Sequence, residues 1–592
     1  MRLNIFKPFW PFLRPYKRQL VLGLILLTLA QIVASAMPYV VKLAIDTVKE
    51  SLDGAEGTVW SKQQVLDEIL WYAGFIFGLA IVQMGLQIGM RWYINSIARY
   101  AEFDIRQVYF SHLLKLSLNY YHQTSTGDLM SRATNDLNTI RMFLAFGIRM
   151  LFDGALAISI TLAVMCSIDW QLSIYTLLPM PFLAVAMSRV ASGVHIGYRD
   201  LQEQFSTISA RVQENLAGIR VVKAYVQREG EIKVFDRLNR DYLERAKKLI
   251  RLESIIRPIS FAIGGASLIM ILWIGGERVI RGEISLGDFV AFNAYVIKLM
   301  FPMMAMGWMM DRYQRAMASM ARIEGVLSQE PEISDAKSPE PLTDIRGEIT
   351  FRNLNFSYDG TPVLKNINLH IPAGSTVAIV GRVGSGKTTL SRLIPRLIQS
   401  EQEGVFIDGV PVQQIPLSLL RENIGYVPQD TFLFSDTLRE NIAFGVEDSS
   451  EEEVNWASEV AQLSKDLKDL PQGLDTMSGE RGVTLSGGQK QRTALARAVI
   501  RKPKILILDD SMASVDTHTE EEILSGLKSV MADRTTILIS HRISTVQGAD
   551  QIVVLDEGEI AEQGTHEELI ALDGIYTDMY RRQQLARQLD EI

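Results

Sequence analysis

Long apolar stretches recur through the first half of the chain, whereas the second half alternates short apolar runs with polar segments. A helix of about 20 apolar residues spans the hydrocarbon core of a bilayer. Six stretches reach about that length, at residues 20–41, 69–90, 150–168, 172–189, 258–276 and 287–310. The pattern therefore predicts a membrane domain over residues 1–329 with six transmembrane helices.

The polar segments between these spans differ in length. Spans three and four are separated by little more than Asp169 and Trp170, which predicts a tight hairpin. The segments between spans two and three and between spans four and five each have about 60 residues. Both are rich in charge and follow a helical period. We expect them to extend the membrane helices well beyond the bilayer.

Basic residues predict the orientation of these spans. The segment between spans four and five carries many of them, whereas the one after span one has Lys42, Lys49 and Lys62 beside more numerous acids. Because cytoplasmic loops are enriched in Lys and Arg, the former is predicted to be cytoplasmic. The basic, aromatic residues 1–18 agree, since they are typical of an interfacial helix. The chain is thus predicted to cross the cytoplasmic (inner) membrane several times, with both termini in the cytoplasm.

A signal peptide is the alternative interpretation of the first span, because Ala34–Ser35–Ala36 is like a cleavage site. The apolar run continues past that site, which favours a retained span. Residues 330–346 are rich in Pro and charge, and they predict a linker. From residue 347 to 592, short β-rich runs alternate with helical segments, which predicts an α/β domain.

Composition adds three exclusions. The 592 residues are 47% hydrophobic with a mean hydropathy of +0.10, too apolar for an ordinary soluble protein. The net charge of −8 is spread without long blocks, so nothing points to nucleic acid as a partner. Cys166 is the single cysteine, which excludes an intrachain disulfide.

The stretch 381–388, Gly-Arg-Val-Gly-Ser-Gly-Lys-Thr, carries the clearest chemistry. It follows the apolar run 376–380 and precedes a helical segment, which is the context of a phosphate-binding P-loop. Glycines let backbone N–H groups turn toward phosphates, the lysine neutralises them, and the threonine hydroxyl can hold Mg²⁺. The predicted nucleotide-binding residues here are Gly381, Gly384, Ser385, Gly386, Lys387, Thr388 and Thr389. We expect ATP and Mg²⁺ as cofactors.

Further motifs occur in a fixed order around this loop. They are Tyr358, then Gln429 after the strand 424–428, then Leu485, Ser486, Gly487, Gly488 and Gln489 before a helix, then Asp509 at the end of an apolar strand, then Asp516, and last His541. The set resembles the nucleotide-binding domain of ABC transporters. With six spans before it, the whole chain resembles a half-transporter of the ABC exporter type. The implied fold is a membrane α-helical domain with long cytoplasmic extensions, followed by an α/β P-loop ATPase domain.

Each motif has a chemical role in this interpretation. The flat ring of Tyr358 suits stacking on adenine, although a strand aromatic in the core is the alternative. Asp509, with Thr388 and Gln429, is placed to hold Mg²⁺ through oxygen ligands. Gln429 can also orient water, and His541 can hydrogen-bond a γ-phosphate.

The stretch 485–489 implies a partner chain. Two adjacent glycines at a helix start can accept phosphate, and the resemblance implies that this signature contacts the nucleotide on the other subunit's P-loop. Asp516 corresponds to the D-loop of the family. Since the chain has one such domain, a second half-transporter is the predicted partner.

One residue departs from the family's pattern, in which Glu follows the strand-end Asp and polarises the attacking water. Here that residue is Asp510. Asp has the same charge but one methylene less, a shortfall of about 1.5 Å that can cost roughly a hundredfold in rate. The sequence thus predicts a degenerate, slow-hydrolysing site, and the alternative is that Asp works adequately in a homodimer. The first interpretation resembles one subunit of the heterodimeric bacterial multidrug ABC exporters.

The membrane half offers candidates for coupling and substrate binding. The stretches 126–136 and 214–224 resemble the short coupling helices of exporters, with solvated helix surface as the alternative. Lys298 lies in span six, where a charge is costly, so we expect a wet cavity or an acidic partner such as Asp153. Span six also holds Met300, Met303, Met304, Met306, Met309 and Met310. Methionines adapt to varied apolar ligands, although helix packing and lipid contact are the simpler explanation.

Four functions are compatible with these sequence features. An ATP-driven exporter of drugs or other lipophilic compounds is favoured. A lipid flippase has the same architecture, but the resemblance implies a homodimer with the usual Glu. A peptide exporter is less favoured because no N-terminal peptidase-like domain is visible. A nucleotide-gated channel or sensor, from a different class, would be favoured by a regulatory domain, and a soluble ATPase is excluded by the spans.

Overall fold

The computed structural model describes residues 7–53, 62–336, 344–358, 360–400, 402–479, 485–512 and 517–590, together with Leu342 and Gly482. The chain divides into two compact units. The first unit consists of Met1–Leu113 and Thr126–Ser328, and the second of Leu114–Ser125 and Gln329–Ile592.

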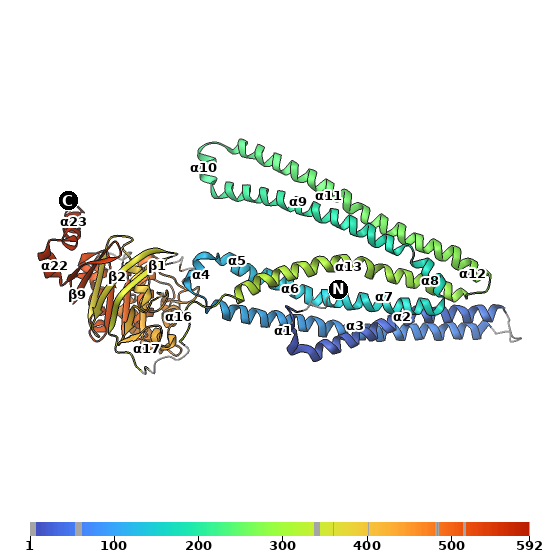
Figure 1. Ribbon diagram of the computed structural model, residues 1–592, viewed down its shortest axis with the longest axis horizontal. Coiled ribbons are helices and arrows are strands. Elements are labelled where there is room, and N and C mark those ends of the chain that lie inside the picture. The colour runs from blue at the N-terminus through green and yellow to red at the C-terminus, as the bar shows by residue number, and fades with distance from the viewer. Residues whose placement is uncertain are drawn as a thin grey trace. The chain divides into compact units, whose positions relative to one another are not determined.

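Long helices make up the first unit (Figure 1). Three helical stretches among the described residues, Trp10–Ser51, Gln63–Leu113 and Thr126–Ile168, are long and apolar enough to cross a membrane. Helix α3 (Lys62–Leu113) has 52 residues and packs along α2 (Lys17–Asp53). At 1.5 Å per residue α3 is about 78 Å long, more than twice the thickness of a bilayer core. The predicted extension of the helices beyond the bilayer is confirmed for this helix.

The remaining helices of the unit include three π-helical turns, η3, η4 and η5, set into longer helices. These elements are α1 (Trp10–Leu13), η2 (Arg14–Tyr16), α5 (Thr126–Ser131), η3 (Arg132–Asp136), α6 (Leu137–Met142), η4 (Phe143–Gly147), α7 (Ile148–Ile168), α8 (Trp170–Leu177), α9 (Met180–Ala217), α10 (Ile219–Ala224), α11 (Arg228–Met270), η5 (Ile271–Gly275), α12 (Gly276–Ile280) and α13 (Leu286–Leu327).

The predicted hairpin between spans three and four is present. Helix α7 ends at Ile168, and the Asp169 carboxylate caps α8 by accepting a hydrogen bond from the backbone N–H of Leu172 at 2.8 Å. The stretches predicted as spans four, five and six lie on α8–α9, α11 and α13. The count of six transmembrane helices stays a prediction.

Helices α9 and α11 form a hairpin that diverges from α13 toward its tip at α10 (Figure 1). Large apolar side chains on this hairpin are exposed, including Phe182 at 70% and Phe261 at 76%. The tip is also apolar, since Val221 and Tyr225 are exposed. The hairpin thus presents apolar surface that this unit does not cover.

The two predicted coupling stretches differ in structure. The stretch 214–224 contains the short helix α10 at the tip of the hairpin. The stretch 126–136 instead forms α5 and η3, which run on without a break into α6 and α7. The separate short helix in this part of the chain is α4 (Leu118–Gln123), which belongs to the second unit. Thr126 therefore begins a long helix rather than a short one.

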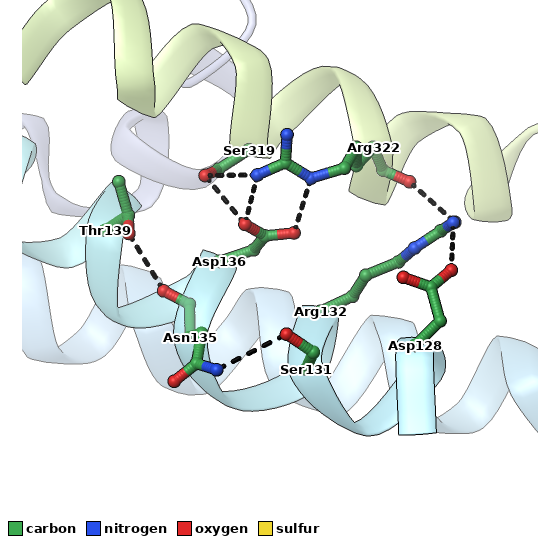
Figure 2. A network of polar contacts seen from close by, with 8 residues as sticks. All are labelled: Asp128, Ser131, Arg132, Asn135, Asp136, Thr139, Ser319 and Arg322. Atoms are coloured by element: carbon green, nitrogen blue, oxygen red, sulfur yellow. Dashed lines mark hydrogen bonds and ion pairs between the residues drawn. The ribbon is translucent and has the colours of Figure 1, made fainter. Parts of the chain in front are cut away.

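A buried carboxylate joins η3 to α13 within the first unit (Figure 2). Asp136 is 8% exposed and accepts hydrogen bonds from both sides of the Arg322 guanidinium, from Nε at 2.9 Å and from Nη2. The Ser319 hydroxyl donates to the same carboxylate at 2.9 Å. Because a buried charge is costly unless it is paired, this contact fixes the two helices against each other.

The second unit contains two sheets. The first has the strand order β2-β1-β4-β5 and is antiparallel. The second has the order β10-β9-β3-β8-β7-β6 and is parallel except for β10. The strands are β1 (Ile349–Tyr358), β2 (Thr361–Ile371), β3 (Thr376–Gly381), β4 (Val405–Ile407), β5 (Val410–Pro411), β6 (Ile424–Val427), β7 (Ile505–Asp509), β8 (Thr535–Ile539), β9 (Gln551–Asp556) and β10 (Glu559–Gly564).

The described part of this unit also contains helices. Besides α4 they are α14 (Lys387–Leu393), α15 (Leu417–Glu422), α16 (Leu438–Ala443), α17 (Glu451–Val460), α18 (Ser464–Leu467), η6 (Gly473–Asp475), α19 (Gly487–Val499), α20 (Thr517–Met531), α21 (Ile543–Val546), α22 (His566–Leu572) and α23 (Ile575–Asp590).

Both faces of the parallel sheet are buried. Alternate residues of β3 enter different clusters, with Ala378 and Val380 in one and Val377 and Ile379 in the other. Successive strand residues point to opposite faces, so a sheet covered on both sides needs continuous apolar runs. This need explains the uninterrupted apolar strands of the sequence.

We predict that Asp136→Ala destabilises the first unit by about 1–3 kcal/mol, because Ser319 and Arg322 lose their buried acceptor. Thermal unfolding of the purified protein in detergent should show a lower melting temperature. Asp128→Ala is the matched control. It removes the more exposed pair of Asp128 with Arg132 (side chains 47% and 21% exposed), which should contribute about 0–1 kcal/mol. Equal melting temperatures for the two variants would contradict the prediction.

Candidate nucleotide site

Three of the sequence-predicted ATP-site residues, Gly381, Asp509 and His541, lie at or just beyond the carboxyl edge of the parallel sheet. Gly381 ends β3, and Asp509 ends β7 opposite Ile539 at the end of β8. Strand β8 lies between β3 and β7, and His541 follows it by two residues. In open α/β sheets, ligands bind at this edge of the strands.

The loop after β3 takes a path that its glycines permit. Gly381, Gly384 and Gly386 have φ angles of 151°, 84° and 101°. A Cβ atom at Gly381 would lie 2.1 Å from the carbonyl oxygen of Leu555, and one at Gly386 would lie 2.7 Å from Leu364. A larger residue would therefore clash with the backbone of β9 at Gly381 and with the Leu364 side chain at Gly386, and both positions have the positive φ that favours glycine.

Lys387 and Ser385 supply donors inside this loop. The Lys387 ammonium is buried and donates to the carbonyl oxygens of Gly381 at 3.0 Å and Arg382 at 2.8 Å. Burial lowers its pKa from the ordinary value, and the carboxylates of Asp510 and Asp509 oppose that shift. The Ser385 hydroxyl is buried without a hydrogen-bond partner among the described residues. An unpaired buried donor beside a cation fits a phosphate oxygen.

Asp509 stands at the centre of an oxygen-rich cluster. Its carboxylate accepts hydrogen bonds from Thr388 at 3.1 Å, Ser391 at 3.2 Å and the Tyr426 phenol at 3.4 Å. Burial raises the pKa of Asp509, and the hydrogen bonds from Thr388 and Ser391 oppose that shift.

These donors fit a Mg²⁺ ion that accompanies a nucleotide. A hydroxyl, a carboxylate and the Gln429 amide are the hard oxygen ligands that Mg²⁺ accepts. Within the part of the chain that the structure describes, no group of three or more His, Cys, Asp or Glu could hold a metal. Phosphate oxygens and water would then complete the coordination, which is usual for Mg²⁺ bound with a nucleotide.

Asp510 lies beside this cluster in an unusual backbone conformation. Its φ angle is 47°, in the left-handed region that Asp and Asn tolerate better than most residues. Its backbone N–H donates to the carbonyl of Ile539 at 2.8 Å, and its carboxylate accepts from the Gln429 amide at 3.3 Å. The site therefore brings together the two residues predicted to act on water.

Comparison with known proteins agrees with this geometry. The family model described as the ABC transporter transmembrane region matches residues 20–303, and the model described as ABC transporter matches residues 364–513. A Bacillus subtilis protein described as a probable multidrug resistance ABC transporter ATP-binding/permease protein, YheI, is 37% identical over 98% of this chain and 98% of its own length. The chain belongs to the ABC transporter family.

Two further similarities extend over nearly the whole transporter chain. An ATP-dependent lipid A-core flippase from Syntrophus aciditrophicus is 33% identical over 100% of this chain and 96% of its own length. The solved structure of a bacterial Atm1-family ABC exporter with ATP bound has a TM-score of 0.79 and 27% identity, covering 96% of this chain and 99% of that one. The transporter is thus a membrane protein with an ATP-hydrolysing translocase domain, and its predicted fold class is confirmed.

The signature stretch of the transporter forms the start of a helix, as predicted. Ser486 caps α19 by accepting from the backbone N–H of Gln489 at 3.2 Å, and the Gln489 side chain accepts from the backbone N–H of Ser486 at 3.0 Å. Leu485 is buried, and Gly487 and Gly488 form the first turn. Asp516, the predicted D-loop residue, lies outside the described residues.

Tyr358 ends β1 with its ring 38% exposed, edge-on to Phe356 at 4.8 Å. It is therefore not a buried core aromatic, and stacking on adenine stays a prediction. Thr389, also assigned to the nucleotide, is buried on the first turn of α14.

Lys298 lies on α13 in the first unit. Its ammonium donates to the Ser35 hydroxyl on α2 at 2.7 Å. Asp153, its predicted acidic partner, instead accepts a hydrogen bond from Gln31 of α2 and acts on Lys298 electrostatically. The side chains of Met303, Met304, Met306 and Met310 lie outside the described part of span six.

Ser391 is a site residue that the sequence interpretation missed. It follows Thr388 by three positions on α14, so both hydroxyls lie on the face toward Asp509. A hydroxyl three residues after the P-loop threonine was the available signal. Ser on a helix often bonds to its own backbone, and the Ser391 hydroxyl also lies 2.9 Å from the carbonyl oxygen of Thr388.

We predict that Ser391→Ala weakens Mg²⁺-dependent ATP binding about fivefold, the equivalent of one lost hydrogen bond to Asp509. Nucleotide affinity measured with Mg²⁺ and again with a chelator would show the effect only with Mg²⁺. Ser529→Ala is the control, because Ser529 is exposed and bonds to the backbone of its own helix. An equal loss of affinity in the presence of chelator would refute the role given to Ser391.

Proposed function

We propose that this chain is one subunit of a heterodimeric ABC exporter that moves lipophilic or drug-like compounds across the cytoplasmic membrane. In this proposal its own site holds ATP and Mg²⁺ but hydrolyses slowly. The observation that carries the proposal is Asp510, which stands where the family's pattern has Glu.

The geometry around Asp510 supports slow hydrolysis. A general base must reach the proton that it removes within hydrogen-bond distance. The Asp510 carboxylate is about one carbon–carbon bond, or 1.5 Å, shorter in reach than Glu. Its backbone is held by Ile539, so the main chain does not make up the difference without breaking that hydrogen bond.

Two features of the chain support a second half-transporter as its partner. Leu485–Gln489 form an intact helix start that would act on the nucleotide of a second chain. The hairpin of α9 and α11 presents exposed Phe182 and Phe261, which a second half-transporter would cover. The exposed apolar tip at α10 would then act as a coupling element against an ATP-binding domain, with the N- and C-termini in the cytoplasm.

The likeness to a chain named as a multidrug resistance transporter supports drug-like compounds as substrates. A homodimeric lipid flippase is the second candidate, favoured by the likeness to a lipid A-core flippase. The two candidates differ at Asp510, because a homodimer would depend on Asp510 for all of its hydrolysis. A peptide exporter and an ATP-gated channel have no such supporting observation.

We predict that the chain purified alone hydrolyses ATP slowly and that Asp510→Glu raises turnover roughly ten- to a hundredfold by restoring the reach of the carboxylate. Steady-state ATPase assays at saturating ATP measure this. The left-handed backbone costs Glu about 1 kcal/mol more than Asp, which lowers stability without blocking the gain.

Two controls accompany this assay. Asp469→Glu adds a methylene at an exposed position of the same domain and should leave turnover unchanged. Asp510→Asn removes the charge and should lower any residual activity. Vigorous turnover by the unmodified homodimer would refute the proposal, whereas co-purification with a chain that has Glu at this position would support it.

Lys298 is the proposed substrate-contacting residue. It links α13 to α2 through Ser35, which is 3% exposed, and Asp153 of α7 lies near enough to act on its charge. Charged groups within spans usually face a pathway or a partner. A cation among three helices suits amphiphilic compounds that carry an acceptor or acidic group.

We predict that Lys298→Ala changes substrate preference while basal ATPase activity is unchanged, because the charge lies outside the nucleotide site. Competition between anionic and neutral lipophilic dyes in vesicle transport assays measures it. Lys49→Ala, at an exposed position of α2, is the control. If Lys298→Ala altered neither transport preference nor ATPase activity, Lys298 would have no role in substrate contact.

A further inference from the structure

We propose that Gln583, on the C-terminal helix α23, is a positioning residue for His541 and thereby sets how well the site distinguishes ATP from ADP. The inference rests on the proposed role of His541 at the γ-phosphate. Gln583 lies 42 positions beyond His541 in the chain, and no motif of the sequence connects them.

One side-chain amide holds the backbone on both sides of residue 542. The Gln583 amide nitrogen donates to the carbonyl oxygen of His541 at 2.5 Å, and its amide oxygen accepts from the backbone N–H of Ile543 at 2.9 Å. A planar amide that donates to one backbone carbonyl and accepts from a nearby backbone N–H makes the same two hydrogen bonds as a residue of a neighbouring β-strand. The two peptide units that flank residue 542 are therefore held in place, and the first of them contains the carbonyl group of His541.

A second contact holds the same turn from the opposite element. Glu520 of α20 is 2% exposed and accepts hydrogen bonds from the Arg542 guanidinium and the Thr545 hydroxyl. The Ser540 hydroxyl accepts from the backbone N–H of Arg542 at 3.0 Å. These bonds involve residues 540, 542 and 545, whereas Gln583 bonds to the main chain of His541 itself.

Helix α23 is anchored firmly enough to act as a support. The Glu562 carboxylate accepts from the backbone N–H groups of Ile575 and Tyr576 at its first turn. Tyr576 is fully buried, and the Thr577 hydroxyl donates to the carbonyl of Leu569 at 2.9 Å. Gln583 follows Tyr576 by seven positions, or about two turns, and so lies on the same anchored face.

Movement of His541 should affect the binding of ATP but not that of ADP. His541 follows β8 next to β3 and its phosphate loop, so a displaced His541 would lose contact with the terminal phosphate first. ADP lacks that phosphate. Loosening the turn should therefore weaken ATP binding and leave ADP binding unchanged, whereas general damage to the domain would weaken both.

The test uses the full-length chain in detergent and measures the affinities of Mg-ATP and Mg-ADP by displacement of a fluorescent ATP analogue. Gln583→Ala should lower the ratio of ATP to ADP affinity about five- to tenfold, the equivalent of one to two hydrogen bonds. Gln583→Glu keeps the acceptor for Ile543 but sets a carboxylate oxygen against the carbonyl oxygen of His541, so it should lower the ratio at least as much as Gln583→Ala. Gln584→Ala is the matched control, because this exposed neighbour bonds to Tyr580 on the same helix, and it should leave the ratio unchanged.

A double-mutant cycle with His541→Ala separates this inference from the proposed function. If His541→Ala lowers the ratio and Gln583→Ala lowers it no further in that background, Gln583 acts through His541. If His541→Ala lowers the ratio but Gln583→Ala alone does not, the inference is wrong and the proposed role of His541 stands. Additive effects, or equal losses for ATP and ADP, would also overturn it. An unchanged ratio in His541→Ala itself would refute the proposed role of His541.

Discussion

The parallel pairing of β3, β8 and β7 is the constraint on which the nucleotide site depends. Residues far apart in the chain reach one edge because Ile379 and Ile539 are paired, as are Asp509 and Ile539. The pairing in turn requires apolar side chains on both faces, which two separate clusters supply. A shift of one residue in any of these strands would turn the cluster residues to the wrong face and carry Asp509 away from Thr388.

Charged groups lie close together at this edge of the sheet, so small shifts in their positions change their electrostatic energy. Lys387 and Asp509 are buried, and Asp510 lies beside Asp509 in the chain. Lys387 donates hydrogen bonds to backbone carbonyls, whereas the two carboxylates accept hydrogen bonds from neighbouring side chains. In a medium of low dielectric, the position of each charge decides its energy far more than it would in water. Asp510 retains the charge of Glu, so the electrostatic balance is kept while the reach of the carboxylate is reduced.

The sequence was informative wherever a local pattern carried the signal. Apolar runs predicted the long helices and buried strands. Glycine spacing predicted a tight loop after β3, where three glycines have positive φ angles. It was less informative where residues meet only through the tertiary fold. Neither Gln583 against His541 nor Arg322 against Asp136 follows from spacing, since each pair joins elements whose approach depends on packing. The stretch 126–136 was predicted as a short coupling helix, but its length was not predicted, because the four segments η3, α6, η4 and α7 continue α5 without a break.

Helix α3 runs for 52 residues without a proline. Prolines lie inside three other long helices of the unit, α2 at Pro38, α11 at Pro258 and α13 at Pro302. Since sharp kinks arise mostly at proline or at inserted turns, α3 should behave as a stiff rod. A rod of about 78 Å that tilts by about 5° moves its far end by roughly 7 Å. Such a helix would act as a lever. A small tilt at one end would produce a larger displacement at the other end, because the helix does not bend in between.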